Sequence, residues 1–502
     1  MSKLAIVYSR AQNGIDAPLV RVEVHLSRGL PGLSIVGMAE TAVKESKDRV
    51  RAAILNTNLE FPKQRITINL SPADLPKEGG RFDLPIAIGI LAASKQICSD
   101  RLTETEFVGE LSLSGDLHTV KGILPIAIQS AKANRVLIVP QDNGAEAALI
   151  SSIVCKTAEN LLQVCSWLNG MEELTHAKKQ KIKSSKKRPD LSEVKGQQQA
   201  KRALEIAASG GHNLLFIGPP GTGKTMLASR MIGILPPLTE HQAIEAAAIA
   251  SISGKGFDIQ QWHIPPFESP HHTASAVAMV GGGSNPKPGD ISRAHFGLLF
   301  LDELPEFSRH VLEVLREPLE SGKVTISRAA RQAEFPASFQ LIAAMNPCPC
   351  GYFGDKEREC FCSQHSIERY RAKVSGPLLD RIDMHVEVCR IPYKELRMEQ
   401  KNTEGSSTIK KRVSAARSVQ MKRNKGKTNA QMNTLEMQKW LNIPESNLIL
   451  LEGIVEKLKL SARAYHRILK ISRTIADLEK SKVIQRSHLL EAISYRCLDR
   501  AI

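Results

Sequence analysis

The segment GPPGTGKT, residues 218–225, has the residue types and spacing of a phosphate-binding loop. It follows the apolar run NLLFI and precedes MLASRMIGIL, whose composition favours a helix, so a strand, a glycine-rich turn and a helix succeed one another. Glycines let backbone amides approach phosphate oxygens, a lysine neutralises their charge, and a hydroxyl can bind Mg²⁺. We predict that Thr225 is a Mg²⁺ ligand and that ATP is held by Gly218, Pro219, Pro220, Gly221, Thr222, Gly223, Lys224 and Thr225.

A second group with chemical potential is the acidic pair Asp302 and Glu303, which follows the apolar run GLLFL. The four apolar residues 298–301 predict a buried strand that carries the pair at its carboxyl end. Such a pair is often only a solvated edge, but its position downstream of the phosphate-binding loop is typical of a Walker B motif. We predict that Asp302 holds Mg²⁺ through water and that Glu303 polarises the water that attacks ATP.

Four cysteines, Cys348, Cys350, Cys360 and Cys362, form two CxC pairs. Four thiolates could enclose a tetrahedral Zn²⁺ and fix the loop between them. The CxC spacing is tighter than the usual CxxC, and four reduced thiols without a metal are an equally good interpretation. A structural zinc is therefore one of two hypotheses for this segment.

Composition limits where the chain acts and on what. Its 502 residues exceed one ordinary core, and at about 150 residues per domain they suggest roughly three domains. We find no apolar run long enough to cross a bilayer and no secretory signal, so we expect a cytoplasmic protein without a membrane partner. Nine cysteines do not make a disulfide framework in so long a chain. The net charge of +16 favours a polyanionic partner such as DNA, and a solvated basic surface is an equal alternative.

The order of apolar runs predicts the elements that position these groups. Short β-rich segments alternate with helical ones at the start of the chain, which is typical of an α/β or α+β domain. NLLFIG, GLLFLDE and FQLIAAMNP end in polar residues or glycine, as strands of a parallel sheet do, and ligand-binding residues then gather at the carboxyl ends of the strands. We predict an N-terminal domain over 1–172, a basic linker over 173–189, a nucleotide-binding core over 190–391 and a helical lid over 392–502.

Several longer stretches resemble one family. They are LSRGLPGLSIVGMAETAVKESKDRVRAAI, INLSPADLPKEGGRFDLPIAIGIL, DLSEVKGQQQAKRALEIAASGGHNLLFIGPPGTGKTMLA, SPHHTAS, LFLDELPEF and MNPCPCGYFGD. Over nearly its whole length the chain is similar to the magnesium-chelatase-like branch of AAA+ ATPases, and within it to the ComM (YifB) subfamily. The resemblance implies an α/β fold, with an AAA+ core built on a parallel sheet and followed by a helical lid.

The same resemblance implies roles for residues outside the two motifs. Val194 and Gln197, in the stretch before the phosphate-binding loop, would contact the nucleotide. Asn346 would be the polar sensor that positions the attacking water, and Arg463 would be the second sensor, carried by the lid. Arg381, in GPLLDRID, would be an arginine finger supplied to a neighbouring subunit. A finger that acts in trans implies a homo-oligomeric ring, which we expect to be a hexamer.

Basic residues of the core are candidates for DNA contacts. GKVTISRAARQAEFPASFQL reads as two β segments, and in DNA-translocating AAA+ proteins a hairpin at this position points into the pore. Arg328 and Arg331 would then follow DNA phosphates, although exposed arginines on hairpins are commonly inert. The basic tract 409–427 could grip DNA or serve as a solvated linker to the lid.

The stretch PFESPHH departs from the family pattern. We expect arginine at the position of Glu268, so the acidic residue argues against a phosphate contact there. His271 and His272 follow, in a long insert between the two nucleotide motifs. They could contact DNA or the adjacent subunit, and a packed or solvated histidine pair is at least as good an interpretation.

The N-terminal domain resembles the proteolytic domain of Lon, which implies an α+β fold of the ribosomal S5 type. KEGGRFD and GELSLSGDLHTVKGILP match its two active-site stretches. A peptidase of that type needs a nucleophilic serine and an activating lysine, and the chain has Arg81 and Leu124 at those positions. We expect a scaffold without peptidase activity. Its charged residues Lys77, Arg81 and Lys121 are either DNA contacts or ordinary surface charges.

The resemblance to the ComM subfamily implies an ATP-driven DNA helicase that promotes branch migration, extending the joint molecule formed by homologous recombination in natural transformation. One alternative is a motor like the ATPase subunit of magnesium chelatase, which remodels a protein partner, and another is a Lon-like protease. The missing serine and lysine argue against the protease. The additional N-terminal domain and the net charge of +16 argue against the chelatase motor.

Overall fold

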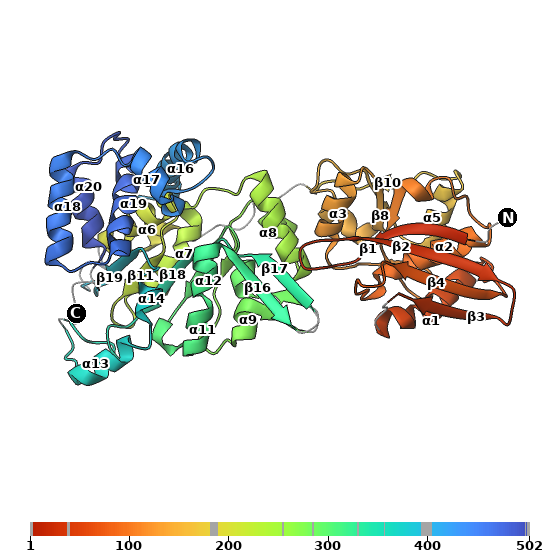
Figure 1. Cartoon of the computed structure of the whole chain (residues 1–502), viewed down its shortest axis with the longest axis horizontal. Coiled ribbons are helices and arrows are strands. Elements are labelled where there is room, and N and C mark those ends of the chain that lie inside the picture. The colour runs from red at the N-terminus through yellow and green to blue at the C-terminus, as the bar shows by residue number, and fades with distance from the viewer. Residues whose placement is uncertain are drawn as a thin grey trace. The chain divides into compact units, whose positions relative to one another are not determined.

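A computed structural model describes residues 4–37, 41–180, 189–253, 256–283, 286–328, 331–355, 357–392, 404–496 and 498. The chain forms two compact units (Figure 1). Unit 1 comprises residues 1–184, 240–262 and 329–333, and unit 2 comprises residues 185–239, 263–328 and 334–502. Residues 181–188 of the linker predicted over 173–189 lie outside the described residues. None of the described helices is long and apolar enough to cross a membrane.

Unit 1 is built on an eight-stranded mixed sheet with the order β10-β9-β8-β5-β1-β2-β4-β3. Alternating apolar residues give the central strands β1, β2 and β4 one buried face, as the period of a β-strand requires. The strands of unit 1 are β1 (Leu4–Arg10), β2 (Leu19–Ser27), β3 (Gly32–Val36), β4 (Arg65–Ser71), β5 (Thr105–Phe107), β6 (Glu110–Leu111), β7 (Leu117–His118), β8 (Val136–Pro140), β9 (Cys155–Ala158) and β10 (Thr175–His176). Because β10 pairs with β9, the sheet continues into the segment that we predicted as linker.

The helices of unit 1 are α1 (Thr41–Asn56), α2 (Asp83–Ala93), α3 (Ile123–Lys132), α4 (Gly144–Ala147), α5 (Leu161–Leu168) and α8 (Glu240–Ile252). Helix α2 is apolar on all sides and fully buried, and its Gly89 allows close approach to Val24 on β2. Helix α8 comes from the insert between the two nucleotide motifs, yet it belongs to unit 1. It packs on α3, and Ser251 donates a hydrogen bond to Glu146.

Unit 2 is built on a five-stranded sheet with the order β12-β15-β18-β11-β19, in which each neighbouring pair is parallel. The strands β11, β15 and β18 are buried along their whole length, which explains their unbroken apolar sequences. The strands of unit 2 are β11 (Leu214–Ile217), β12 (Phe267–Glu268), β13 (Gly281–Gly282), β14 (Lys287–Pro288), β15 (Leu298–Leu301), β16 (Lys323–Arg328), β18 (Gln340–Met345) and β19 (Met384–Glu387). Strand β17 (Arg331–Pro336) begins in residues assigned to unit 1 and ends in residues of unit 2. The predicted α/β class with a parallel sheet is confirmed.

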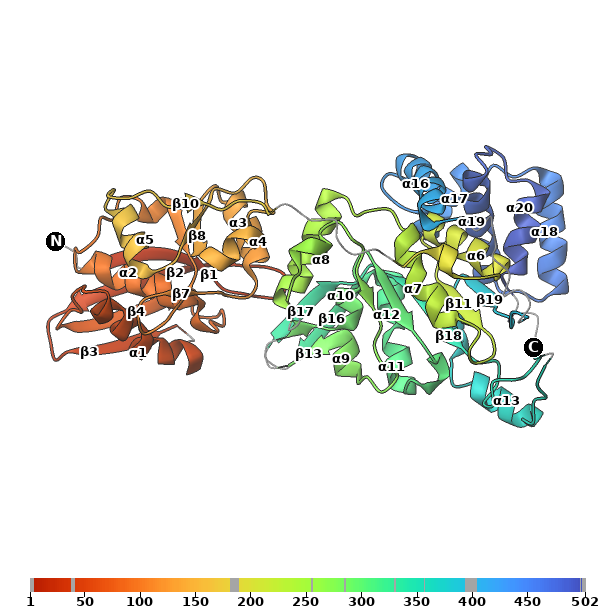
Figure 2. The same ribbon diagram turned by 180° about the vertical axis from the view of Figure 1, so that it is seen from behind.

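The lid helices α16 (Ser406–Arg423), α17 (Thr434–Trp440), α18 (Glu445–Lys457), α19 (Ala462–Leu478) and α20 (Arg486–Ser494) follow the sheet. They gather beside α6 (Gln198–Gly210), and Figure 2 shows this group from the opposite side. Apolar residues of α16, α19 and α20 share one core with α6 and the sheet. The remaining helices of unit 2 are α7 (Lys224–Ile234), α9 (Ala276–Val280), α10 (Asp290–Arg293), α11 (Arg309–Val314), α12 (Arg316–Ser321), α13 (Gln364–Arg371) and α14 (Gly376–Leu379).

Candidate active site

The phosphate-binding loop connects the carboxyl end of β11 to the first residue of α7. Gly221 and Gly223 have φ angles of 77° and 87°, which favour glycine. A Cβ atom at Gly218 would lie 2.2 Å from the carbonyl oxygen of Val388, so only glycine allows this close approach to the chain beyond β19. Because α7 begins at Lys224, the loop ends at a helix N-terminus, where backbone amides can receive phosphate.

Lys224 is buried and lies between the loop and the end of β18. Its Nζ atom donates hydrogen bonds to the carbonyl oxygens of Gly218 at 2.6 Å and Pro219 at 2.9 Å, and to Oδ1 of Asn346 at 3.1 Å. Two residues that were predicted from different motifs thus meet in one cluster. Burial lowers the pKa of Lys224 to about 8, against the opposing effect of Asp302 and Glu303.

The predicted magnesium ligands are adjacent in space. Oγ1 of Thr225 donates a hydrogen bond to Oδ2 of Asp302 at 2.6 Å, and the backbone N–H of Glu303 donates to Oδ1 of the same carboxylate at 2.9 Å. A hydroxyl and a carboxylate oxygen are the ligands that Mg²⁺ prefers. The pair can therefore share one Mg²⁺ beside the phosphate-binding loop.

Glu303 has a partner that the sequence did not reveal. Its backbone has a positive φ of 52°, and Nδ1 of His272 lies 3.3 Å from its Oε2 atom. The His271 ring lies against the His272 ring, with centroids 4.1 Å apart. His271 and His272, for which the sequence offered several roles, therefore lie beside Glu303 of the acidic pair.

Val194 and Gln197 directly precede α6, and Gln197 contacts the chain that follows β19. Nε2 of Gln197 donates a hydrogen bond to the carbonyl oxygen of Cys389 at 2.6 Å, just beyond the carboxyl end of β19. Val194 is buried in the core that unit 2 shares with its lid. Gln197 therefore lies at the same edge of the sheet as the phosphate-binding loop.

Arg381 and Arg463 do not join this cluster. The carbonyl oxygen of Arg381 accepts hydrogen bonds from Asn213, which precedes β11, at 3.0 Å and from Arg467 at 3.2 Å. At about 3.3 Å per strand residue, Asn213 is about 16 Å from Gly218. The backbone of Arg381 therefore lies at the amino edge of the sheet. Arg463 is exposed on α19, one helical turn before Arg467.

The guanidinium of Arg381 is held within its own chain. Nη2 lies 2.5 Å from Oε1 of Glu320, and Nη1 donates to the carbonyl oxygen of Pro377 at 2.7 Å. The side chain is only 9% exposed, whereas that of Glu320 is 56% exposed. Arg381 must leave this ion pair before it can contact another subunit.

The other basic candidates have mixed outcomes. The two β segments around Arg328 and Arg331 form the paired strands β16 and β17, but both side chains lie outside the described residues. In the tract 409–427, Arg412 pairs with Glu205 and Glu404, and Arg417 donates to the carbonyl oxygen of Ala208. These arginines of the tract attach the lid helix α16 to α6, and a DNA contact by them is not needed to explain their charge.

The departure at Glu268 has a local explanation. Oε2 of Glu268, on the edge strand β12, lies 3.3 Å from Nη2 of Arg293. The same guanidinium also pairs with Asp290. An acidic residue therefore belongs to an ion-pair network at this position.

The two peptidase-like stretches of unit 1 also meet in space. Arg81 donates hydrogen bonds to Gln12 at 2.9 Å and to the carbonyl oxygen of Lys121 at 3.4 Å. Leu124 is buried, so neither position supplies a nucleophile or a base. Lys77 is buried as well and donates to the carbonyl oxygen of Pro72, which corrects its suggested role as a DNA contact.

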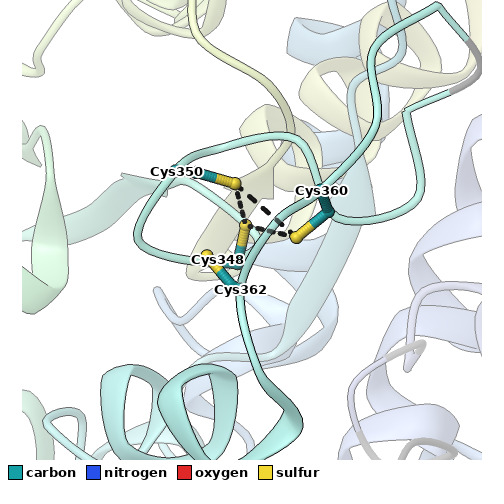
Figure 3. Close-up of side chains that lie close together, drawn as sticks. All are labelled: Cys348, Cys350, Cys360 and Cys362. Atoms are coloured by element: carbon teal, nitrogen blue, oxygen red, sulfur yellow. Dashed lines mark hydrogen bonds between the residues drawn. The ribbon is translucent and has the colours of Figure 1, made fainter.

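The four clustered cysteines come together where the two ends of the loop that follows β18 approach each other (Figure 3). The Sγ atom of Cys348 lies 3.3 Å from that of Cys350 and 3.6 Å from that of Cys360, and all four Sγ atoms lie within 4.8 Å of one another. At Zn–S distances of about 2.3 Å, a tetrahedral site places its sulfur atoms about 3.8 Å apart. The arrangement can therefore hold a metal ion.

The lowered pKa of Lys224 predicts that ATP binding depends on pH. Phosphate favours the ammonium form, which predominates below pH 8 and is lost as pH rises through about 8. Between pH 7 and pH 9 the protonated fraction falls about tenfold, so we expect ATP affinity to fall about tenfold. Equilibrium binding of a fluorescent ATP analogue across this range measures the effect. The Lys224→Arg control stays charged and should give a flat profile, and a flat wild-type profile would contradict the prediction.

Comparison with known families covers most of the chain. The family described as magnesium chelatase, subunit ChlI, matches residues 190–396, and its C-terminal part matches residues 403–496. The family described as subunit ChlI of Mg-chelatase matches residues 22–143.

Comparison with individual proteins gives full-length relatives. The chain is 50% identical to the competence protein ComM of Haemophilus influenzae, over 99% of the chain and 98% of that protein. It is also 50% identical to the uncharacterized protein YifB of Escherichia coli K12, over the same shares. Similarity to the magnesium-chelatase 38 kDa subunit of Cereibacter sphaeroides is 26% and spans 31% of the chain and 52% of that protein.

Proposed function

Because the chain belongs to the ComM (YifB) group of magnesium-chelatase-like AAA+ proteins, a family that implies ATP hydrolysis, we propose that it is a ring-forming DNA motor. The motor uses ATP to drive branch migration during recombination in natural transformation. The competence name of the Haemophilus influenzae relative and the net charge of +16 support DNA as the substrate. Access to chromosomal DNA requires a cytoplasmic location.

The observation that supports the ring is the separation between Lys224 and Arg381, the proposed arginine finger. The backbone of Arg381 lies at the amino edge of the sheet, and the phosphate-binding loop lies at the carboxyl edge. An arginine at the amino edge can complete an ATP site only in a neighbouring subunit. A ring in which each amino edge faces the next carboxyl edge meets this requirement, and we propose a hexamer.

The site residues then have defined roles. ATP is bound by residues 218–225, with Lys224 on the terminal phosphates and Gln197 at the base or ribose end. Thr225 and Asp302 hold Mg²⁺, and Glu303 accepts a proton from the attacking water that Asn346 helps to orient. The four cysteines bind a structural Zn²⁺.

A magnesium-chelatase-like motor that remodels a protein partner is the second candidate. It is favoured by the family descriptions, since the three matched regions all carry the name of the chelatase subunit. The low identity and partial coverage of the Cereibacter sphaeroides chelatase subunit weigh against it. A Lon-like protease is disfavoured by Arg81 and Leu124, which replace its nucleophile and base.

The test measures ATP hydrolysis by the full chain with and without forked and four-way-junction DNA, together with strand displacement. We expect branched DNA to raise the hydrolysis rate and ATP to drive displacement. The control is Lys224→Ala, which removes the phosphate-binding ammonium and should lose both activities. Hydrolysis that is indifferent to DNA, without displacement, would reject the DNA motor and favour the protein-remodelling motor.

A further inference from the structure

The cysteine loop touches the nucleotide site, and we propose that Zn²⁺ bound by Cys348, Cys350, Cys360 and Cys362 clamps the phosphate-binding loop. Occupancy of the metal site would then set the affinity for ATP. The inference rests on the proposed ATP site and adds a function for the metal.

The sulfur cluster has the chemistry of a closed structural site. Four thiolates without a carboxylate or an open position suit Zn²⁺ in its structural rather than its catalytic use, and soft sulfur ligands exclude Mg²⁺ and Ca²⁺. Cys348 is fully buried, and the backbone N–H of Phe353 donates to its Sγ atom at 3.3 Å. Hydrogen bonds of this kind orient metal-bound sulfur and offset its charge. The cluster is therefore arranged for a metal rather than for four independent thiols.

Both ends of the cysteine loop are attached to the sensor residue. Cys348 follows Asn346 by two residues at one end, and at the other end Ser363 caps α13 directly after Cys362. The backbone of Asn346 is hydrogen-bonded to Tyr370, and Nε of Arg371 donates to the carbonyl oxygen of Pro347 at 3.2 Å. Since both residues of α13 contact the end of β18, a metal that closes the loop also fixes the backbone of the sensor.

The middle of the loop lies against the phosphate-binding loop. Gly351 has a φ of 85°, and a Cβ atom there would lie 2.7 Å from Cδ of Pro220 and 3.8 Å from Cγ of Asn346. Asn346 in turn accepts the hydrogen bond from Lys224. The metal-closed loop thus supports both the backbone that surrounds the phosphates and the side chain that accepts from Lys224. Without the metal, ordering this loop would cost conformational entropy. Part of the free energy of ATP binding would then be used to order the loop, and the affinity for ATP would fall.

Two glycines of the loop allow a matched test of the contact. Gly351→Ala adds a Cβ atom against Pro220 at a positive φ, whereas Gly354→Ala adds one at a φ of 79° with nothing within 4 Å. The two variants share the backbone strain and differ in the contact. We expect Gly351→Ala to retain one zinc per chain and to bind ATP about tenfold more weakly, and Gly354→Ala to change ATP affinity less than about twofold.

The metal itself is tested in the same full-length protein. Zinc is quantified by mass spectrometry of the purified protein, and affinity is measured with a fluorescent ATP analogue. Cys360→Ser/Cys362→Ser should lose zinc and weaken ATP binding about tenfold, while the exposed Cys98→Ser control should change neither. If the double variant fails to fold, zinc is instead displaced from the wild type with a mercurial and restored with thiol and Zn²⁺. ATP affinity should fall and recover accordingly.

Each remaining outcome identifies what fails. Zinc that can be removed without a change in ATP affinity, with equal affinities for Gly351→Ala and Gly354→Ala, would overturn the clamp and leave the ATP site intact. A chain without metal, whose four thiols react freely or form disulfides, would overturn the zinc site itself. A zinc-loaded wild type that does not bind ATP would contradict the proposed function on which the clamp rests.

Discussion

An Arg381→Ala chain is expected to bind ATP as tightly as the wild type and to hydrolyse it about a thousandfold more slowly. The reason is the position of Arg381 at the amino edge of the sheet, about 16 Å along β11 from the loop that would bind phosphate in its own chain. On the proposed assignment, the arginine stabilises transition-state charge at the ATP of a neighbouring subunit. Binding is measured with a fluorescent analogue and hydrolysis by phosphate release from the assembled ring.

The control for this variant is Glu320→Gln, which breaks the ion pair with Arg381 without removing the guanidinium. If Arg381 acts only by holding its own chain together, both variants should lose activity to a similar extent. If it acts on the neighbouring subunit, Glu320→Gln should keep most of its activity, because the released guanidinium of Arg381 can still contact the ATP site of that subunit.

Mixed rings separate action in trans from action in cis. Arg381→Ala subunits have an intact phosphate-binding loop, and Lys224→Ala subunits have an intact finger, so each variant should be inactive alone. Mixing the two variants should restore hydrolysis at interfaces where the phosphate-binding loop of an Arg381→Ala subunit faces Arg381 of a Lys224→Ala subunit. Arg381→Ala rings with undiminished hydrolysis, or mixtures that remain inactive although they co-assemble, would reject the assignment.

The cluster at the carboxyl edge could be predicted from sequence because its members end a strand or belong to the loop that follows one. An apolar run that ends in a polar residue indicates both the strand and the position of the residue, and parallel strands bring such ends together. Asp302 and Asn346 end such runs, whereas Lys224 was predicted from the spacing of the phosphate-binding loop. The structure brings Lys224 and Asn346 within 3.1 Å. Their roles remain predictions that the experiments above address.

The contacts that sequence reasoning missed join distant segments, and the local sequence of each segment does not indicate which other segment it contacts. His272 precedes Glu303 in a different loop, and nothing in the stretch PFESPHH indicates which of several acidic residues it meets. Gly351 and Pro220 likewise meet only because β18 and β11 are neighbours in the sheet. Tertiary packing decides which distant elements are neighbours, and the periodicity and motif spacing of a sequence do not report it.

Charge was the least reliable guide to function. Lys77 is in a glycine-rich, charged stretch typical of a surface loop, yet it is buried against a carbonyl oxygen. Arg412 and Arg417 belong to a basic tract, yet they fasten α16 to α6. A long side chain can pair its charge with an acidic or carbonyl group within the fold, and the sequence does not show whether such a group is near.

Glu303→Gln is expected to keep ATP affinity near that of the wild type and to lower hydrolysis by about 10²–10⁴-fold. The amide has the shape of the carboxylate but cannot accept the proton of the attacking water. Lys224, Thr225 and Asp302, which make the proposed contacts with phosphate and Mg²⁺, are unchanged. The variant should therefore trap ATP, and strand displacement on branched DNA should be lost with it.

Single-turnover hydrolysis and nucleotide retention after gel filtration measure the two effects of Glu303→Gln separately. The matched control is Glu306→Gln, which neutralises a carboxylate three residues further along the chain that pairs only loosely, at 3.4 Å, with Lys373. It should hydrolyse ATP within about twofold of the wild-type rate, because substitutions at exposed charges usually have small effects. Hydrolysis by Glu303→Gln at the wild-type rate would show that another residue is the general base. Loss of ATP binding would show that Glu303 stabilises the nucleotide site rather than activating water.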